Sequence, residues 1–303
     1  MLCLQGKLIQ NKIVVVRKKM LDEMVNNNRV LKLVATDLDG TFLRNDKSIS
    51  KENIDTLHSL GEKGILRVMA TGRNLKKTME VVSDDVPFDY IVFSSGAGVY
   101  DRRNEKLVYH QNLSQDAVQR LSEFLIVNDL NFHLFKPVPD NYMCWYHRGT
   151  VPCAEFENYF TYLQAHSEPL PEGKPVDSEA CQFLVVFPNN LERFLKLKDD
   201  IESQFPEVKV VRTSSPLETG YIWMEIFHRS VSKGNGVRFV CDFHQIEHEH
   251  TLGIGNDFND LDLLEFTNYS YIVANGPEEL KHRFLLAKSN EESAFALTVE
   301  KYL

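Results

Sequence analysis

The sequence predicts an α/β protein built on a doubly wound, mostly parallel sheet, with a smaller α+β domain inserted into it. From Leu31 onward, short apolar runs alternate with amphipathic stretches of helical spacing, the order that builds a parallel sheet flanked by helices. Between residues 114 and 218 the pattern changes to apolar runs joined by short polar turns, which is typical of antiparallel strands. We therefore assign residues 31–113 and 219–303 to a core domain and residues 114–218 to an inserted domain.

The first half of the core reads as βαβαβ. Ser50 is a good N-cap for a helix in which Leu57 and Leu60 have helical spacing, and Gly61 or Gly64 can end that helix. In chain order we expect a strand ending at 33–35, a helix at 51–64, a strand at 65–70, a short helix from 75, a strand with a bend at 90–101 and a hairpin turn at 102–105.

The inserted domain begins with an amphipathic helix that Ser114 caps. The remaining expected elements of the insertion are strands at 132–138 and 142–146, a helix at 154–164, a strand at 181–187, a helix at 189–205 and a strand at 207–214. The chain then returns to the core, with a strand at 221–228, a helix at 231–244, a buried strand at 250–255, a loop and helix at 256–266, and a strand at 269–275 before the closing helices.

Composition excludes several classes of function. The apolar content of 43% supports a proper core, and a net charge of −9 argues against nucleic acid as the main partner, because phosphate backbones need a basic surface. No apolar run approaches the roughly 18–20 residues of a membrane span, so we expect no membrane partner. Residues 1–30 fit no signal peptide and read as a disordered lead-in, with Met20 or Met24 as alternative starts.

The cysteines indicate a reducing compartment. They are five in number, scattered, and without C-x-x-C spacing, so they read as free thiols rather than as a disulfide or zinc framework. We expect a cytoplasmic protein.

The stretch LVATDLDGTFL, residues 33–43, is the most informative in the chain. Asp37 and Asp39 follow an apolar strand at alternate positions, and Gly40 allows the chain to turn sharply. Two carboxylates this close at a strand end are costly unless a cation or a proton lies between them. The alternative is an ordinary strand end with an Asp-Gly turn.

Three further motifs stand at strand ends or helix starts. Thr71 follows the strand RVMA and is either a phosphate-binding hydroxyl or a helix cap. Lys233 lies where a helix begins, where a cation works against the helix dipole, so nearby anions explain it better than solvent does. The acidic segment GNDFND, residues 255–260, follows a buried strand. In an open α/β sheet these strand ends lie along one edge, where ligands bind.

Together these motifs resemble those of the haloacid dehalogenase-like hydrolases, and the resemblance extends from Leu31 to Leu303. It implies a Rossmann-like core. An insertion between Thr71 and Lys233, with the loop SSGAGVYD and the segment IVANGPEELK, resembles the Cof-type branch with its large α/β cap. That branch implies Mg²⁺-dependent hydrolysis of small phosphorylated metabolites, often sugar phosphates, through an aspartyl phosphate.

The resemblance also implies roles for individual residues. Asp37 is the expected nucleophile and Asp39 the acid and base, with Thr71 and Lys233 completing the catalytic set. The expected substrate-binding residues are Thr71, Gly72, Arg73, Ser95, Gly96 and Lys233. The expected metal ligands are Asp37, Asp39, Asn256, Asp257 and Asp260.

The sequence departs from the family's G-D-x-x-N-D pattern at Asn256, which takes the place of the first Asp. An amide oxygen can bind Mg²⁺, so we expect Asn256 to touch the metal directly, while Asp257 acts through water or orients Lys233. Asn256 is also the one feature that favours a non-catalytic phosphometabolite-binding protein. A phosphomutase is the other alternative.

Two further expectations concern other parts of the protein. His244, His248 and His250 invite a metal hypothesis, but they lie in a polar connector and read as a solvated loop. We expect a small phosphorylated molecule as the partner, and a monomer or homodimer.

Overall fold

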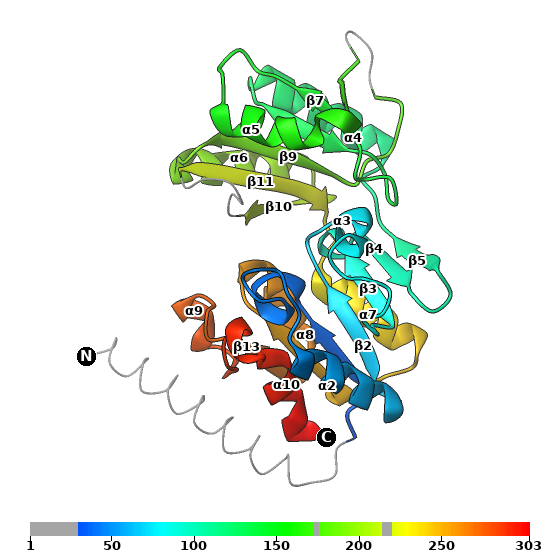
Figure 1. Ribbon diagram of the computed structural model, residues 1–303. Coiled ribbons are helices and arrows are strands. Elements are labelled where there is room, and N and C mark those ends of the chain that lie inside the picture. The colour runs from blue at the N-terminus through cyan, green and yellow to red at the C-terminus, as the bar shows by residue number, and fades with distance from the viewer. Residues whose placement is uncertain (1–29, 172–175, 214–219) are drawn as a thin grey trace, which may run out of the picture.

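The computed structural model describes residues 30–171, 176–213 and 220–303. Apart from residue 30, the lead-in predicted at 1–30 lies outside the described residues. The chain forms two bodies, a larger one that contains both ends of the described chain and a smaller one that lies over it (Figure 1). The prediction of a doubly wound α/β core with an inserted α+β domain is confirmed.

The larger body is built on a sheet of eight strands within the described residues, in the order β14-β13-β12-β1-β2-β3-β4-β5. Neighbouring strands from β14 to β3 run parallel, whereas β4 pairs antiparallel with β3 and β5 pairs antiparallel with β4. The strands are β1 Leu33–Thr36, β2 Leu66–Ala70, β3 Tyr90–Phe93, β4 Gly98–Asp101, β5 Lys106–His110, β12 Thr251–Gly255, β13 Tyr269–Ile272 and β14 Leu285–Leu286.

Helices cover both faces of this sheet. They are α2 Lys51–Glu62, α3 Leu75–Met79, α7 Lys233–Phe243, α8 Leu261–Phe266, α9 Glu278–Lys281 and α10 Ala294–Val299. Side chains of β1 alternate between the two faces: Val34 packs in the cluster that contains α2 and α10, whereas Leu33 and Ala35 pack with α7 and α8. The same alternation points Asp37, which follows β1, toward the α7 side.

The smaller body has a six-stranded sheet within the described residues, in the order β10-β11-β9-β6-β7-β8. All its pairs are antiparallel except β7 with β8. Its elements are α4 Gln115–Val127, β6 Phe132–Phe135, β7 Cys144–His147, α5 Ala154–Leu163, β8 Ser167–Pro169, β9 Gln182–Pro188, α6 Leu191–Gln204, β10 Val208–Thr213 and β11 Tyr221–His228. Apolar side chains of α4 and α6 pack in one cluster with one face of the sheet.

The placement of residues 221–228 corrects the predicted domain boundary. We expected this run to be the first strand of the returning core, but β11 pairs along its length with β9 and β10 in the cap sheet. A run that is apolar on both faces is typical of a strand in a parallel sheet. Here the strand is apolar on both faces because helices cover one and α5 and the core lie on the other. We refer to residues 114–228 as the cap.

No helix formed by the described part of the chain combines the length and the apolar character needed to cross a bilayer.

Candidate active site

Asp37 is held at the carboxyl end of the central strand. Its backbone N–H donates to the carbonyl of Ile254 on β12 at 2.8 Å. The residue is 4% exposed, and its two carboxylate oxygens accept from Lys233 Nζ at 2.7 Å and Thr41 Oγ1 at 2.9 Å. Burial raises the pKa of Asp37 and the Asp260 charge adds to this, against the opposing effect of Lys233. The carboxylate is therefore fixed in direction.

Asp39 lies two residues further along, past the end of β1. The Asp39 carboxylate accepts two hydrogen bonds from Arg73, from Nε at 2.6 Å and from Nη2 at 2.8 Å, and a third from Lys47 Nζ at 2.9 Å. Burial alone would raise the pKa of Asp39, but these two cations outweigh it and lower the pKa to about 2. Asp39 is thus an ionised carboxylate in this arrangement.

Lys233 is the first residue of α7 and is 1% exposed. Ser232 caps the helix, its Oγ accepting from Asn235 N at 3.0 Å. Lys233 Nζ donates to Asp37 Oδ1 at 2.7 Å and to Asp260 Oδ1 at 2.6 Å. Burial would lower the pKa of Lys233, but the carboxylates of Asp260 and Asp37 raise it. The anions that the sequence led us to expect near this lysine are therefore present.

In the acidic segment after β12, the residue that contacts Lys233 is not the one we expected. The Asp260 carboxylate is fully engaged: Oδ1 accepts from Lys233, and Oδ2 accepts from the backbone N–H groups of Asn256 at 2.8 Å and Asp257 at 3.1 Å. Asp260 therefore orients Lys233, a role we had considered for Asp257, and both of its carboxylate oxygens accept hydrogen bonds from these donors. Asp257 Oδ1 accepts from the N–H of Phe258 at 2.7 Å.

Asn256 brings a third oxygen-bearing group to Asp37. One terminal atom of its side-chain amide lies 3.1 Å from Asp37 Oδ2 and 3.2 Å from the carbonyl oxygen of Asp39. An amide nitrogen in that place donates to both oxygens. After a half-turn of the amide, three oxygens face one another there, which is the donor set that a hard divalent cation takes. The residues present thus fit a Mg²⁺ ion.

The residues after β2 and β3 form the opposite side of the site. Thr71 is buried directly after β2, and its hydroxyl accepts from the N–H of Arg73 at 3.2 Å. The N–H of Ser95 donates to the Thr71 carbonyl at 3.0 Å, which ties the two strand ends together. Ser95 and Gly96 have positive φ angles of 55° and 99°. Gly72 is exposed beside them.

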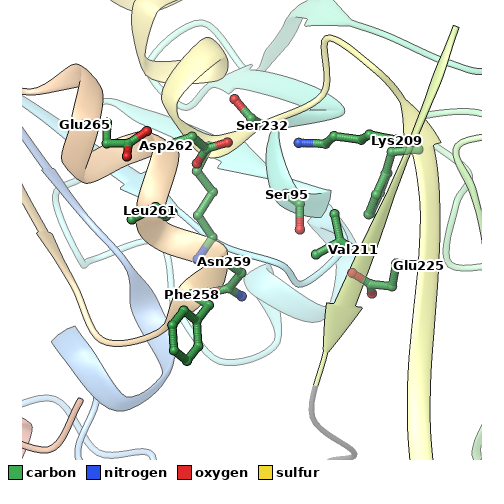
Figure 2. Close-up of a pocket in the computed structure, with 12 residues that line it drawn as sticks. Ser95, Lys209, Val211, Glu225, Ser232, Phe258, Asn259, Leu261, Asp262 and Glu265 are labelled. Carbon is green, nitrogen blue, oxygen red and sulfur yellow. The ribbon is translucent and has the colours of Figure 1, made fainter. Parts of the chain in front are cut away.

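A cavity of about 230 Å³ lies between the cap and this edge of the core. Lys233 is one of its lining residues on the core side. Figure 2 shows Ser95 on the core side of the cavity and Lys209 and Glu225 on the cap side. Burial raises the pKa of Glu225 to about 7, and it lowers the pKa of Lys209.

Sequence reasoning missed several residues of the site. Lys47, which donates a hydrogen bond to Asp39, lies in a polar loop without a recognisable sequence pattern. Asn275 supports the turn after β1, its Nδ2 donating to the Gly40 carbonyl at 2.8 Å; it belongs to the segment IVANGPEELK, whose resemblance could have pointed to it. Lys209 and Glu225 carried no motif.

The histidine cluster forms no metal site in the described residues, where no group of three or more His, Cys, Asp or Glu side chains could hold a metal ion. His244 ends α7 and its Nε2 lies 2.8 Å from the hydroxyl of Tyr90.

The fold is a parallel α/β core with an inserted cap, and one edge of the core sheet brings together Asp37, Thr71 and Lys233. The family model described as haloacid dehalogenase-like hydrolase matches residues 34–297, and the chain belongs to this family.

Curated and solved proteins agree with this assignment. The chain is 24% identical over 292 residues to the 5-amino-6-(5-phospho-D-ribitylamino)uracil phosphatase YwtE of Bacillus subtilis. This alignment covers 90% of this chain and 98% of that protein. The structure is similar to the phosphatase BT1666 of Bacteroides thetaiotaomicron, with a TM-score of 0.74, 17% identity and coverage of 91% and 96%. It is also similar to the subclass IIB sugar phosphatase BT4131, with a TM-score of 0.70, 15% identity and coverage of 89% and 98%.

Proposed function

We propose that this protein is a Mg²⁺-dependent phosphatase that hydrolyses small phosphorylated metabolites, with sugar phosphates as the main class, through an aspartyl-phosphate intermediate. The observation that carries the proposal is the position of Asp37 between Lys233 on one side and the Asp39 carbonyl and Asn256 on the other. Support for the substrate class comes from the similar proteins, one named for a phosphorylated ribityl compound and another as a sugar phosphatase.

Asp37, the backbone carbonyl of Asp39 and Asn256 would hold Mg²⁺, with Asp257 acting through water. When bound there, Mg²⁺ neutralises charge on the phosphate oxygens. Thr71 and Lys233 would bind the remaining oxygens, since a buried hydroxyl and a buried ammonium provide the positioning and charge stabilisation that phosphoryl transfer needs.

In the first step a carboxylate oxygen of Asp37 attacks phosphorus, and the bond from phosphorus to the alcohol oxygen of the substrate breaks. Asp39 gives its proton to that oxygen as it leaves. In the second step Asp39 takes a proton from water, whose oxygen attacks phosphorus, and the bond to Asp37 breaks. Inorganic phosphate and the original Asp37 carboxylate result.

Arg73 connects these steps. Asp39 must be protonated to act as an acid, yet the bidentate contact with Arg73 stabilises its ionised form. An arriving phosphate competes for the guanidinium, because phosphate and carboxylate fit the same fork of N–H donors. Arg73 would then bind substrate, as the sequence led us to expect, and Asp39 would lose the larger of the two cationic contacts that favour its ionised form, while Lys47 remains.

Mutation of the two aspartates tests the mechanism. We expect Asp37→Asn to abolish Mg²⁺-dependent release of phosphate from p-nitrophenyl phosphate while the variant remains folded by circular dichroism. Asp39→Asn should slow the second step, so that phosphoenzyme accumulates and can be detected by mass spectrometry after acid quench. Ordinary turnover by Asp37→Asn would rule out Asp37 as the nucleophile. An isomeric sugar phosphate in place of free phosphate would indicate a phosphomutase.

We further propose a cytoplasmic protein, monomeric or homodimeric, in keeping with its scattered thiols. Four of these cysteines lie in the described residues, where they are buried and free.

A further inference from the structure

The cavity between cap and core is continuous with the proposed catalytic site, because Lys233 contributes to its lining. A phosphate bound at Lys233 would therefore place its leaving group in this cavity. Its volume of about 230 Å³ is below the roughly 300–1,000 Å³ of pockets that bury drug-sized ligands. A small leaving group fits this volume.

The cap side of the cavity is formed by alternate residues of two paired strands. On β11, Ile222, Met224 and Ile226 pack with the helices of the cap, so Glu225 and Phe227 point the other way. Lys209 is the cross-strand neighbour of Phe227 on β10 and shares that face. Figure 2 shows Lys209 and Glu225 on the cap side of the cavity, with Asp262 and Phe258 on the core side.

Three of these side chains have hydrogen-bonding capacity left for a ligand. Among the described residues, Lys209 forms no ion pair within 4 Å, although the charges of Asp262 and Glu225 act on it. Within the same residues the buried Oδ1 of Asp262 has no hydrogen-bond partner. Glu225 Oε1 accepts from Gln182 Nε2 at 3.3 Å, which leaves the rest of its carboxylate available.

This mixture of charges discriminates between chemical groups. Lys209 donates only. Above its pKa of about 7 the carboxylate of Glu225 accepts only, as does the unpartnered carboxylate oxygen of Asp262. An ammonium group in the leaving group would pair with the carboxylates but face Lys209, and a carboxylate would pair with Lys209 but face Glu225 and Asp262. A hydroxyl both donates and accepts, so several hydroxyls on one carbon chain satisfy all three residues.

Phe258 adds an apolar surface at the core side of the cavity. Phe258 is 53% exposed and directly follows Asn256 and Asp257 in the chain. An exposed aromatic ring beside polar groups suits a molecule with C–H groups on one side and hydroxyls on the other.

Resting on the phosphatase function proposed above, we propose that Lys209 and Glu225 of the cap, with Asp262 of the core, select a small, neutral, polyhydroxylated leaving group and discriminate against both anionic and cationic analogues. The cap residues recognise the alcohol part of the substrate, whereas Asp37 and Lys233 act on its phosphate.

A matched set of substrates, assayed above the pKa of Glu225 of about 7, tests this assignment: glucose 6-phosphate, glucosamine 6-phosphate and 6-phosphogluconate carry neutral, cationic and anionic leaving groups. We expect the wild type to have the highest kcat/KM for the neutral substrate. Lys209→Met should shift the ratio of kcat/KM toward glucosamine 6-phosphate by about tenfold, and Glu225→Gln should shift it toward 6-phosphogluconate by a similar factor, as removal of one charged hydrogen bond predicts. Opposite shifts from the two variants are the signature of the subsite.

Ratios within one variant cancel any general loss of activity, and the comparison with wild type cancels differences in the shape of the substrates. Arg212→Met and Glu123→Gln are the controls, because both residues are exposed and Arg212 lies on the opposite face of β10. They should leave all ratios unchanged.

The failure of this proposal is distinguishable from the failure of the phosphatase function. A wild type that hydrolyses p-nitrophenyl phosphate but does not prefer the neutral sugar phosphate, or variants that shift no ratio, overturns the subsite alone. Absence of hydrolysis with every substrate overturns the proposed function. Calorimetric binding of the same three compounds to wild type, Lys209→Met and Glu225→Gln then decides the subsite by the same opposite shifts in Kd.

Discussion

Asn256 sets the charge of the proposed metal site. Its side-chain amide lies 3.1 Å from Asp37 Oδ2, at a position where the family pattern has a carboxylate. With Asn, the only formal negative charge among the three groups that would hold Mg²⁺ directly is that of Asp37. Fewer charged ligands bind a divalent cation more weakly.

We expect Asn256→Asp to tighten Mg²⁺ binding by about tenfold, because a second carboxylate joins the ligand set. In the absence of Mg²⁺ the same variant should be less stable than wild type by about 1–2 kcal/mol, since two carboxylates then face each other without a cation. Calorimetric titration with Mg²⁺ measures the first effect, and urea unfolding with and without EDTA measures the second.

Asn259→Asp is the matched control, because it adds the same charge at an exposed position of the same loop. It should change Mg²⁺ affinity by less than about threefold, as expected for a screened surface charge. Equal effects of the two variants would mean that general electrostatics, and not a ligand at position 256, governs the binding of Mg²⁺.

Single residues also mark how far sequence reasoning extends. A lysine at a helix start indicated nearby anions, and Lys233 does contact Asp37 and Asp260. The sequence could not tell which aspartate of residues 256–260 would meet it. That choice depends on the backbone turn that directs two N–H groups onto Asp260, and sequence spacing does not specify such a turn.

Among the elements, the turn after β3 and the start of α7 are in close contact. A Cβ built on Gly96 would lie 2.0 Å from the carbonyl oxygen of Ser232, the residue that caps α7 just before Lys233. Gly96 also has a φ of 99°, in the region that favours glycine. The absence of a side chain at this position therefore lets α7 bring its lysine to the site.

We expect Gly96→Ala to lower the free energy of unfolding by about 3 kcal/mol or more, because backbone strain and a backbone clash add together. Turnover of p-nitrophenyl phosphate should also fall by about tenfold or more, since a displaced helix start moves Lys233 from Asp37. Urea unfolding and steady-state kinetics measure the two effects.

Gly64→Ala is the comparison, because Gly64 has a φ of 70° and no atom within 4 Å of the added Cβ. It should cost about 1–2 kcal/mol from backbone strain alone and leave turnover unchanged. If Gly96→Ala cost no more than Gly64→Ala, the contact with Ser232 would not constrain the site.

Elements were predictable where local signals decide them. Ser50 and Ser114 cap α2 and α4 as expected, accepting from Asn53 N and Ala117 N. The strand at 221–228 shows the limit, because burial on both faces is the same sequence signal in a parallel core and in a cap sheet. In the structure this strand pairs with β9 and β10. Which strands pair depends on contacts between distant parts of the chain, and no local sequence pattern encodes these contacts.

For the whole molecule, the closure of the cap over the core creates properties that neither body has alone. Lys209 and Glu225 carried no motif because their role depends on a surface from another part of the chain. Glu225 lies on the cap strand β11, yet the core residues Asp262 and Lys233 line the same cavity. The order of motifs along the sequence predicted that Asp37, Lys233 and the segment 256–260 meet at one edge of the core, but not which cap residues face that edge.

Closure of the cap also makes stability depend on pH. Burial raises the pKa of Glu225 from 4.5 to about 7, although Gln182, Lys233 and Lys209 lie near enough to oppose this. Between these two values the folded protein holds a proton that the unfolded chain has lost, so this contribution to the free energy of unfolding is complete below about pH 4.5 and is lost as the pH rises through about 7. We therefore expect Glu225→Gln, which cannot ionise, to be more stable than wild type by about 1–3 kcal/mol above pH 7 and nearly equal to it near pH 4.5. Urea unfolding across this range measures the difference, with Glu123→Gln on the exposed side of α4 as a control that should show no such trend. A constant difference between Glu225→Gln and wild type at all pH values would mean that Glu225 is not enclosed between cap and core in solution.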